Sequence, residues 1–208
     1  MIVRRLPVGP VATNCYIAGC EQTYLAAVID PGDDAPQILA QLEQRKLKPA
    51  YILLTHAHFD HIGALADLLD AIGPVPVAMH PADLPLFRHH GGAALFGMRI
   101  RPAPEPDRQL APGQVVEVGA LRFAVRHTPG HTPGHVIFYE ESSRAAFTGD
   151  VIFENSIGRT DLPGASYEQL MTSIREQVLS LPGDTMLFPG HGPRTSVSRE
   201  LAGNPFLG

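Results

Sequence analysis

An apolar run that stops abruptly at a group of histidines sets the strongest limit on how this chain can fold. Residues 50–61 have the sequence AYILLTHAHFDH. A continuous apolar run of this length is typical of a strand that is buried on both faces. Thr55 marks the end of that strand. The polar residues that follow form the turn into the next helix, so they gather at the end of a strand that lies inside a core.

The side chains of this turn suit a pair of metal ions. Residues two apart in an extended segment point the same way, so His56 and His58 can converge on one ion. Asp60 and His61 come after the chain bends and can face a second ion beside the first. Imidazole and carboxylate ligands suit zinc, iron or manganese. The plain alternative is a solvated polar loop, and three histidines and one aspartate within residues 56–61 argue against it.

A second histidine-rich loop, HTPGHTPGH at 127–135, contains Thr-Pro-Gly-His twice in succession. Each proline fixes φ and each glycine admits conformations that other residues avoid, so the loop is stiff. A stiff loop can present a ligand without the metal having to order it. We expect one of His127, His131 and His135 to bind an ion and another to orient a ligand or to hydrogen-bond in the core. Spacing alone does not choose among them, although a structural or orienting role is favoured for His127 and His135.

Asp150 and His191 stand apart from these clusters, and each directly follows an apolar strand, in AAFTGD and MLFPGH. Alone, a carboxylate at a strand end is usually a cap or turn former, and a histidine in a Pro-Gly turn is usually structural. Beside a histidine cluster, Asp150 becomes a candidate for a metal bridge. Four strand-end loops that carry histidine or aspartate therefore predict one convergent site.

The remaining pattern predicts an α+β layered domain rather than a parallel βαβ wind, because strands cluster in both halves and helices follow each cluster. Residues 88–109, rich in glycine and proline, are interpreted as a long surface excursion, and such loops are often functional. Strands are expected at 2–8, 14–19, 24–30, 50–55, 75–79, 114–118, 121–125, 136–140, 144–149 and 185–190, and helices after a cap at Asp33 or Asp34, at 62–69, after a Ser166–Gln169 capping box and at 197–203.

The composition limits the kinds of binding partner that we expect. The formal net charge is −5 and no run of lysine or arginine is present, so we expect neither nucleic acid nor an anionic membrane as a partner. No apolar run approaches the roughly 18 residues that span a bilayer. The N-terminal residues lack the apolar stretch of a signal peptide, which makes a cytoplasmic protein the default expectation. Cys15 and Cys20 are too few for a disulfide framework or a cysteine metal site, and we expect them to be core thiols.

Together these motifs resemble the metallo-β-lactamase superfamily. Its His-x-His-x-Asp-His signature is complete at 56–61, and TPGHTPGH, FTGD and PGHG match its later motifs in the same order. VIDPG at 28–32 and the earlier NCYIAG also fit, so the resemblance covers essentially the whole chain, as a single domain over 1–208. It implies a four-layer αββα sandwich with the site at one edge between the sheets. It assigns His56, His58 and His131 to one ion, Asp60, His61 and His191 to the other, and Asp150 to the bridge.

The resemblance also implies a hydrolase that uses two divalent metal ions. Zinc is the expected metal, with iron and manganese as alternatives. Two ions roughly 3.5–4 Å apart can share a bridging hydroxide that attacks the substrate, and Asp60 could both ligate and orient the water. Within the superfamily the chain is most similar to the glyoxalase II-like hydrolases, which cleave hydroxyacyl thioesters of glutathione. A small-molecule thioester of the S-lactoylglutathione type is therefore the expected substrate.

GRTDLPGAS at 158–166 looks like the short bacterial members of that group. Arg159 falls where the longer enzymes carry a basic residue that holds glutathione, which makes it a candidate for binding a substrate carboxylate. Two features differ from the longer enzymes. Asp161 stands where they place a tyrosine, and few residues follow His191, so no C-terminal helical glutathione-binding domain is expected. A more open pocket follows from the second difference.

Other activities compete with this interpretation. Iron-dependent persulfide dioxygenases of the same superfamily use two histidines and one carboxylate, here His56, His131 and Asp150. Retention of the other four ligands favours two metals and hydrolysis. Nothing in the loops singles out a lactonase or a lactamase, and a nuclease would need a basic groove. A binding module without turnover is disfavoured, because open His/Asp sites generally keep a position for water.

Overall fold

Strand β2 (Thr13–Gly19) shows how the chain builds its layers. Every residue of β2 is buried. Because side chains alternate across a strand, Cys15 and Ile17 enter one apolar cluster. Tyr16 and Ala18 enter a different cluster on the opposite face. A strand that is buried on both sides must lie between two layers, so this sheet is covered on each face.

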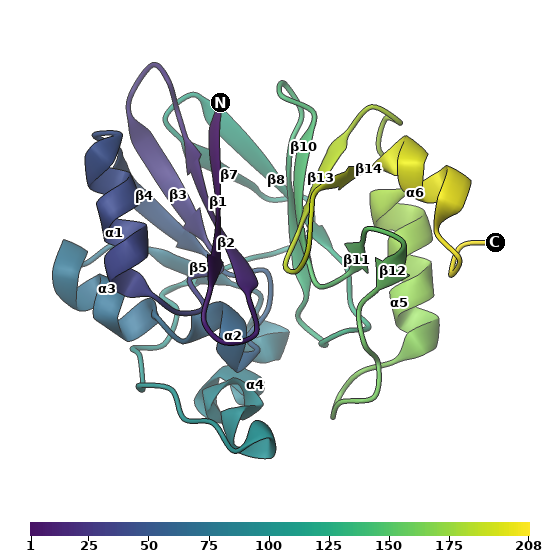
Figure 1. The fold of residues 1–208 in the computed structure, drawn as a ribbon, viewed down its shortest axis with the longest axis horizontal. Coiled ribbons are helices and arrows are strands. Elements are labelled where there is room, and N and C mark those ends of the chain that lie inside the picture. Colours follow the sequence, from purple (N-terminus) through teal and green to yellow (C-terminus); the bar gives the residue numbers. More distant parts are fainter.

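Two six-stranded sheets pack face to face in the computed structural model, which describes residues 1–208 (Figure 1). The first has the order β1-β2-β3-β4-β5-β6 and the second β14-β13-β10-β9-β8-β7. The strands of the first sheet are β1 (Ile2–Val8), β2, β3 (Leu25–Ile29), β4 (Lys48–Leu53), β5 (Val77–Met79) and β6 (Arg108–Gln109). Those of the second are β7 (Val115–Val118), β8 (Leu121–His127), β9 (Val136–Glu140), β10 (Ala145–Gly149), β13 (Met186–Pro189) and β14 (Thr195–Ser196). A separate hairpin pairs β11 (Ile152–Phe153) with β12 (Ser156–Ile157).

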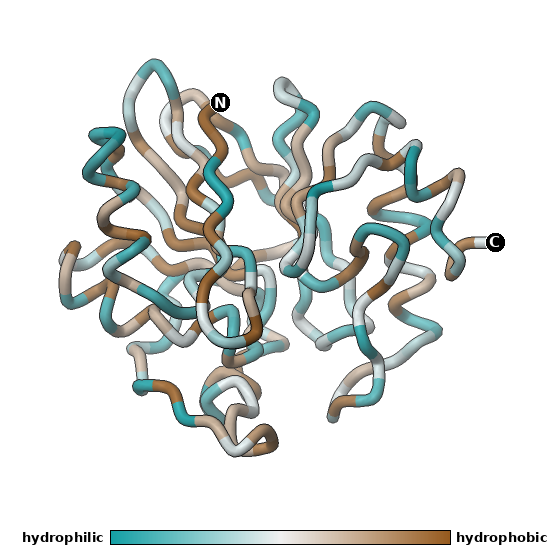
Figure 2. The backbone as a smooth tube through the Cα atoms, in the orientation of Figure 1, coloured by the Kyte–Doolittle hydropathy of each residue, from teal (hydrophilic) through white to brown (hydrophobic).

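Helices cover the outer face of each sheet, which completes four layers and confirms the expected α+β fold of αββα type. The helices are α1 (Ala35–Gln44), α2 (Phe59–Ile62), α3 (Leu65–Ile72), α4 (Leu84–Arg88), α5 (Tyr167–Ser173) and α6 (Val197–Gly203), with 3₁₀ turns at Pro81–Asp83 and His90–Phe96 and a π-helical turn at Ile174–Val178. Figure 2 shows hydrophobic residues along the central strands, whereas the outer helices carry both hydrophobic and hydrophilic residues. None of the helices combines the length and the apolar character that crossing a bilayer requires.

Part of the first sheet is a parallel βαβ arrangement, which the strand clusters did not lead us to expect. Strands β3, β4, β5 and β6 are parallel neighbours, whereas β1, β2 and β3 are antiparallel. Parallel neighbours need a crossover connection, and helices α1 and α3 supply two of them. The α+β fold therefore contains a short segment of parallel βαβ units between residues 25 and 79.

Two local expectations about helices were wrong. Asp34 does not cap α1 with its side chain, because it adopts a left-handed conformation with φ of 54° and accepts a hydrogen bond from Gly9 N instead. The helical stripe after Ser166 (Tyr167, Leu170, Met171 and Ile174) predicts that Tyr167 packs in the core, but its side chain is 55% exposed. The expected cap of α5 does form, since Ser166 Oγ accepts from Gln169 N.

Most residues of the segment 88–109 are exposed, as predicted for a surface excursion, but its 3₁₀ turn is anchored to the core side. Its 3₁₀ turn His90–Phe96 lies over the histidine turn that follows β4. Gly91 is buried with a φ of +63°, and a side chain there would collide with the backbone of Phe59. Phe96 also packs on the Phe59 ring, with ring centroids 5.3 Å apart. The 3₁₀ turn, rather than the whole segment, therefore forms a wall beside the histidines.

The two sheets are joined at one edge by hydrogen bonds from buried side chains of β2. Tyr16 OH donates to Pro189 O at 2.7 Å, and Asn14 Nδ2 donates to Pro189 O and Gly192 O at 2.9 Å each. We expect Tyr16→Phe to lower the free energy of unfolding by about 1 kcal/mol, since Asn14 still satisfies Pro189 O. Asn14→Ala removes two hydrogen bonds and should cost about 2 kcal/mol. Urea unfolding of the metal-free protein measures both, and equal losses would contradict this account.

Candidate metal centre

The predicted ligands all lie at strand ends along one edge of the two sheets. The turn 54–61 follows β4 of the first sheet. The loop 128–135, Asp150 and His191 follow β8, β10 and β13 of the second. Backbone hydrogen bonds tie the two sheets together here, from Val136 N to Thr55 O at 2.8 Å and from Asn14 N to Gly190 O at 2.7 Å. Residues far apart in sequence therefore meet at one place.

One group of ligands consists of His56, His58 and His131. Their ring nitrogens lie within 4.8 Å of one another, and all three residues are buried. His58 Nδ1 and His131 Nε2 are 2.9 Å apart. His131 is thus the member of the doubled Thr-Pro-Gly-His loop that the structure brings to this group. Three converging imidazoles match the donors that zinc and iron prefer.

The second group consists of Asp60, His61 and His191, whose ligand atoms also lie within 4.8 Å of one another. His191 Nε2 is 3.2 Å from Asp60 Oδ2, and His61 Nε2 is 3.6 Å from the same oxygen. The two groups are adjacent, because the His56 and His61 rings are 4.1 Å apart.

Asp150 lies between the two groups. Its Oδ1 is 3.5 Å from His61 Nε2, and its Oδ2 is 3.6 Å from His131 Nε2 and 3.5 Å from His191 Nε2. One carboxylate therefore faces ligands of both groups, as a bridging ligand must. Gly190 permits this approach, since a Cβ at that position would collide with the Asp150 carboxylate.

The unsatisfied atoms of the site fit a pair of metal ions. Buried polar atoms in proteins almost always have hydrogen-bond partners. Here His56 Nε2, His61 Nε2 and Asp150 Oδ1 are buried and have none. Each of these atoms is a lone-pair donor that faces the space between the ligands, and no cysteine is nearby. This donor set suits an open divalent-metal site rather than a closed structural zinc site.

Asp30, which the sequence placed only within a family-like segment, orients two of the ligands. Its carboxylate accepts hydrogen bonds from Thr55 N at 2.7 Å and Thr55 Oγ1 at 2.6 Å. His61 Nδ1 lies 3.0 Å from Asp30 Oδ2, and His56 Nδ1 lies 3.0 Å from Thr55 Oγ1. Because Nδ1 is engaged in both residues, each imidazole presents Nε2 to the metal position. Buried carboxylates commonly orient metal-binding histidines in this way, here directly for His61 and through Thr55 for His56.

Asp83 is a buried residue that the sequence analysis missed, because in PADLPLF it looks like part of an ordinary helical turn. Its carboxylate accepts from Ala57 N at 3.0 Å, Thr132 Oγ1 at 2.7 Å and Gly134 N at 2.6 Å. It therefore links the first histidine turn to the doubled Thr-Pro-Gly-His loop. Burial raises the pKa of Asp83, and these three donors oppose that rise.

The other two histidines of the loop have supporting positions. His135 is fully buried, with Nδ1 2.8 Å from Thr128 Oγ1 and Nε2 accepting from Asp150 N at 3.1 Å. Since Nε2 accepts, His135 is neutral, and burial lowers its pKa well below the usual value. His127 lies outside the cluster, where its Nε2 is 2.9 Å from Pro133 O.

Arg159 lies at the rim of the site. Its backbone carbonyl is 2.9 Å from His131 Nδ1, which fixes the orientation of that ligand. Its guanidinium forms a bidentate pair with Asp161, at 2.7 and 2.8 Å, and the side chain is half exposed. A cavity of about 200 Å³ opens over the ligands, lined by Val11, His58, Phe59, Asp60, Phe96, His131, Asp150, Arg159, Leu162 and His191.

The carboxylates and imidazoles of the site shift one another's pKa values. Burial opposes protonation of His61 and His191, but the facing carboxylates of Asp150 and Asp60 outweigh it. They raise the pKa of His61 well above its usual value and that of His191 to about 9. Burial likewise opposes ionisation of Asp60, and the positive charge of His61 outweighs it and lowers the Asp60 pKa to about 2.

The number of metal ions bound per chain tests the assignment of the ligands to two groups. We expect the native chain to hold about two divalent ions, and His191→Ala to hold about one, because it removes a ligand of the second group alone. His127→Ala is the matched control, since it removes an imidazole close in sequence to the cluster but outside it, and should keep the native content. Elemental analysis after dialysis measures the content. An unchanged content in His191→Ala would contradict the assignment.

Metal binding should release protons. In the metal-free site His191, with a pKa of about 9, and His61 are protonated at pH 7, yet both must be neutral to bind metal. The raised histidine pKa values mean that apparent metal affinity increases as pH rises from 6 to 9, and that proton release declines above the pKa of His191. Calorimetric titration in buffers of different ionisation enthalpy measures the protons released. No release at pH 7 would contradict the charge state assigned here.

Comparison with known proteins agrees with this geometry. Residues 8–191 match the sequence profile of the Metallo-beta-lactamase superfamily. The chain is 39% identical to the probable metallo-hydrolase YqgX of Bacillus subtilis, over 98% of this chain and 96% of that protein. It is 37% identical to the hydroxyacylglutathione hydrolase GloC of Haemophilus influenzae, over 100% of this chain and 98% of that protein.

Solved structures show the same fold. The BLEG-1 B3 metallo-beta-lactamase has a TM-score of 0.91 at 38% identity, with 99% of each chain covered. TTHA1623, in a di-iron-bound form, has a TM-score of 0.90 at 43% identity, with 99% of this chain and 100% of that chain covered. ETHE1 from Myxococcus xanthus has a TM-score of 0.81 at 28% identity, with 99% and 84% covered. The chain belongs to the metallo-beta-lactamase superfamily and carries the histidine and aspartate site of a divalent-metal-dependent hydrolase of that superfamily.

Proposed function

We propose that this protein hydrolyses thioesters of small molecules, with hydroxyacyl thioesters of glutathione as the substrate type. The observation that carries the proposal is the position of Asp150 between two complete ligand groups beneath an open cavity. The similarity over the full chain to a hydroxyacylglutathione hydrolase supports the substrate type. We expect zinc, with iron or manganese as alternatives, and TTHA1623 gives an iron-bound relative.

When bound, two divalent ions supply a water of lowered pKa and polarise the substrate carbonyl. The chain's own residues hold this chemistry in place. His58 and Asp60, from the loop after β4, and His131 and His191, from loops of the second sheet, all line the cavity, so the thioester carbonyl has to approach these four side chains. Because no serine or cysteine lines the cavity, the chain offers no side-chain nucleophile of that kind, and water is the expected attacking group.

Asp60 is the residue that we propose for orienting the attacking water. Thr13 Oγ1 donates to Asp60 Oδ2 at 2.8 Å, which fixes the carboxylate. The side chain is 15% exposed, so it faces both the ligands and the cavity. Its low pKa keeps it ionised at neutral pH, and an ionised carboxylate can accept a proton or hydrogen bond from water.

Arg159 remains the proposed contact for a substrate carboxylate. It lines the cavity, and its guanidinium lies 5.8 Å from the centre of the Phe96 ring. Asp161 already engages Nε and Nη2, which leaves Nη1 to reach a ligand. We therefore expect Arg159 to contribute to substrate affinity and little to the chemical step.

A second candidate is an iron-dependent persulfide dioxygenase. His56, His131 and Asp150 form a two-histidine, one-carboxylate set of the kind that non-haem iron oxygenases use. The structural similarity to ETHE1 and to a di-iron protein supports this candidate. The complete second group, Asp60, His61 and His191, favours hydrolysis, because a mononuclear iron enzyme does not need it.

Turnover of S-lactoylglutathione by the metal-loaded protein tests the proposal. We expect Asp60→Ala to lower kcat/KM by about 10³-fold, because it removes both a metal ligand and the group that orients water. His127→Ala should keep native turnover, and circular dichroism checks that both variants fold. Oxygen uptake with glutathione persulfide, together with one iron per chain and no thioester cleavage, would contradict hydrolysis.

A further inference from the structure

An apolar groove adjoins the metal centre and has no part in the function described so far. Its volume is about 580 Å³, within the range of about 300–1,000 Å³ that is typical of small-molecule sites. It shares His58, Phe96 and Leu162 with the smaller cavity over the ligands. Any group held in the groove is therefore continuous with the reacting centre.

We propose that this groove binds the acyl part of the substrate, and that the enzyme prefers thioesters whose acyl chain is longer and more apolar than lactoyl. This inference rests on the proposed thioester hydrolysis and specifies its substrate class. A medium-length alkanoyl chain is the occupant to which the groove is suited. Its carbonyl lies at the metal centre, and its chain extends past His58 between the 3₁₀ turn 90–96 and residues 162–164.

The residues that line the groove argue for an uncharged occupant. They include Leu86, Leu95, Phe96 and Leu162, and they contain no lysine, arginine, aspartate or glutamate. Glutathione carries carboxylates and an ammonium group, and burying such charges without partners is costly. The glutathionyl part of a substrate would therefore find no counter-charge here, whereas each buried methylene of an acyl chain is favourable.

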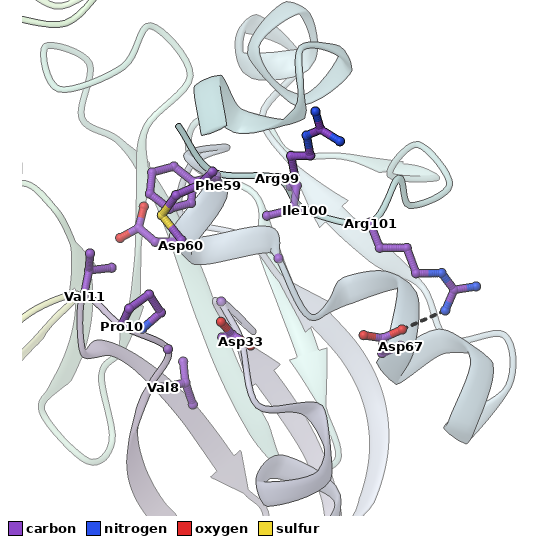
Figure 3. Close-up of a pocket in the computed structure, with 14 residues that line it drawn as sticks. Val8, Pro10, Val11, Asp33, Phe59, Asp60, Asp67, Arg99, Ile100 and Arg101 are labelled. Carbon is purple, nitrogen blue, oxygen red and sulfur yellow. Dashed lines mark hydrogen bonds and ion pairs between the residues drawn. The ribbon is translucent and has the colours of Figure 1, made fainter. Parts of the chain in front are cut away.

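The opposite flank of the metal centre suits the thiol part of the substrate. A second pocket, of about 210 Å³, shares Val11, Phe59 and Asp60 with the cavity over the ligands. Figure 3 shows this pocket with charged residues around it, among them Arg99 and an Arg101–Asp67 ion pair. A polar thiol carrier would meet charged groups on this side, and Arg159, which lines the central cavity but neither flank, is available to one of its carboxylates. The contrast between the apolar groove and the charged pocket predicts the orientation of the substrate, with its acyl part in the groove and its thiol part on the charged side.

The groove is preformed. Gly91, in its lining, packs closely against the Phe59 backbone, so the 3₁₀ turn is held against the ligand turn. Pro85, Pro133 and Pro163 stiffen the other sides. Leu95, 67% exposed, and Ala94 face the groove without supporting the ligands. A preformed apolar wall binds a chain without the cost of ordering itself first.

Two series of thioesters test the assignment with the zinc-loaded protein. The first series is N-acetylcysteamine thioesters with acyl groups from acetyl to decanoyl. The second is acetyl thioesters of alkanethiols of increasing length. We expect kcat/KM to rise about threefold per methylene in the acyl series until the groove is full, and to stay level in the thiol series. A rise in the thiol series alone would overturn the acyl assignment.

Variants in the groove wall connect the selectivity to its residues. Ala94→Trp should fill the groove and lower kcat/KM for the octanoyl thioester about tenfold, while the acetyl value changes less than about twofold. Leu95→Ala should lower the octanoyl value about threefold. Leu201→Ala and Val115→Trp are the matched controls, since both positions are exposed and lie outside the groove, and they should keep the native chain-length profile. Equal profiles in all variants would overturn the inference.

Binding of octanoate and acetate, measured by calorimetry on the same zinc-loaded protein, separates this inference from the proposed function. Octanoate should bind at least about tenfold more tightly than acetate, and Ala94→Trp should abolish the difference. Thioester cleavage with a flat acyl profile and equal binding of the two acids would refute the groove and leave the hydrolase standing. No cleavage of any thioester, with tight octanoate binding lost in Ala94→Trp, would refute the hydrolase and retain the groove as a site for an apolar chain.

Discussion

The metal centre depends on two buried carboxylates, Asp30 and Asp83, that hold its turns in position. Burying a carboxylate is costly unless its oxygens are hydrogen-bonded. Asp30 accepts from both the amide and the hydroxyl of Thr55 and faces His61 Nδ1. Asp83 accepts from donors in both histidine loops. Their own need for partners thus fixes the ligand turns and the directions in which the imidazoles converge.

This arrangement also explains why the site lies where the two sheets meet. Each sheet supplies one part of the ligands, so neither can form the centre alone. The backbone bonds Val136 N to Thr55 O and Asn14 N to Gly190 O join the sheets beside the ligands. The core below is continuous across the sheets, with Tyr16 and Phe147 in edge-to-face contact. The packing of the two-sheet core therefore also holds the metal-ligating side chains in position.

Local sequence pattern predicted the strands and the places where ligands stand, because an apolar run that ends in polar residues marks a strand end. Spacing alone did not choose His131 over His135, since both follow Thr-Pro-Gly. A structural role was favoured for His135, and in the fold its Nε2 accepts a hydrogen bond from Asp150 N. The pattern missed Asp83, whose partners lie 26 to 51 residues away. It also placed Tyr167 in the core, because the helical stripe does not show that the first turn of α5 stands clear of the sheet.

One short segment links the metal to substrate selection. The carbonyl of Arg159 orients His131, and three residues later Leu162 lines both the ligand cavity and the apolar groove. Because the bidentate Arg159–Asp161 pair lies between these two points, it stiffens the stretch that joins them. A substrate chain that presses on Leu162 therefore acts on the same loop that holds a metal ligand. At Leu162, unlike at Ala94 and Leu95, the wall of the proposed acyl groove and the support of His131 belong to one loop.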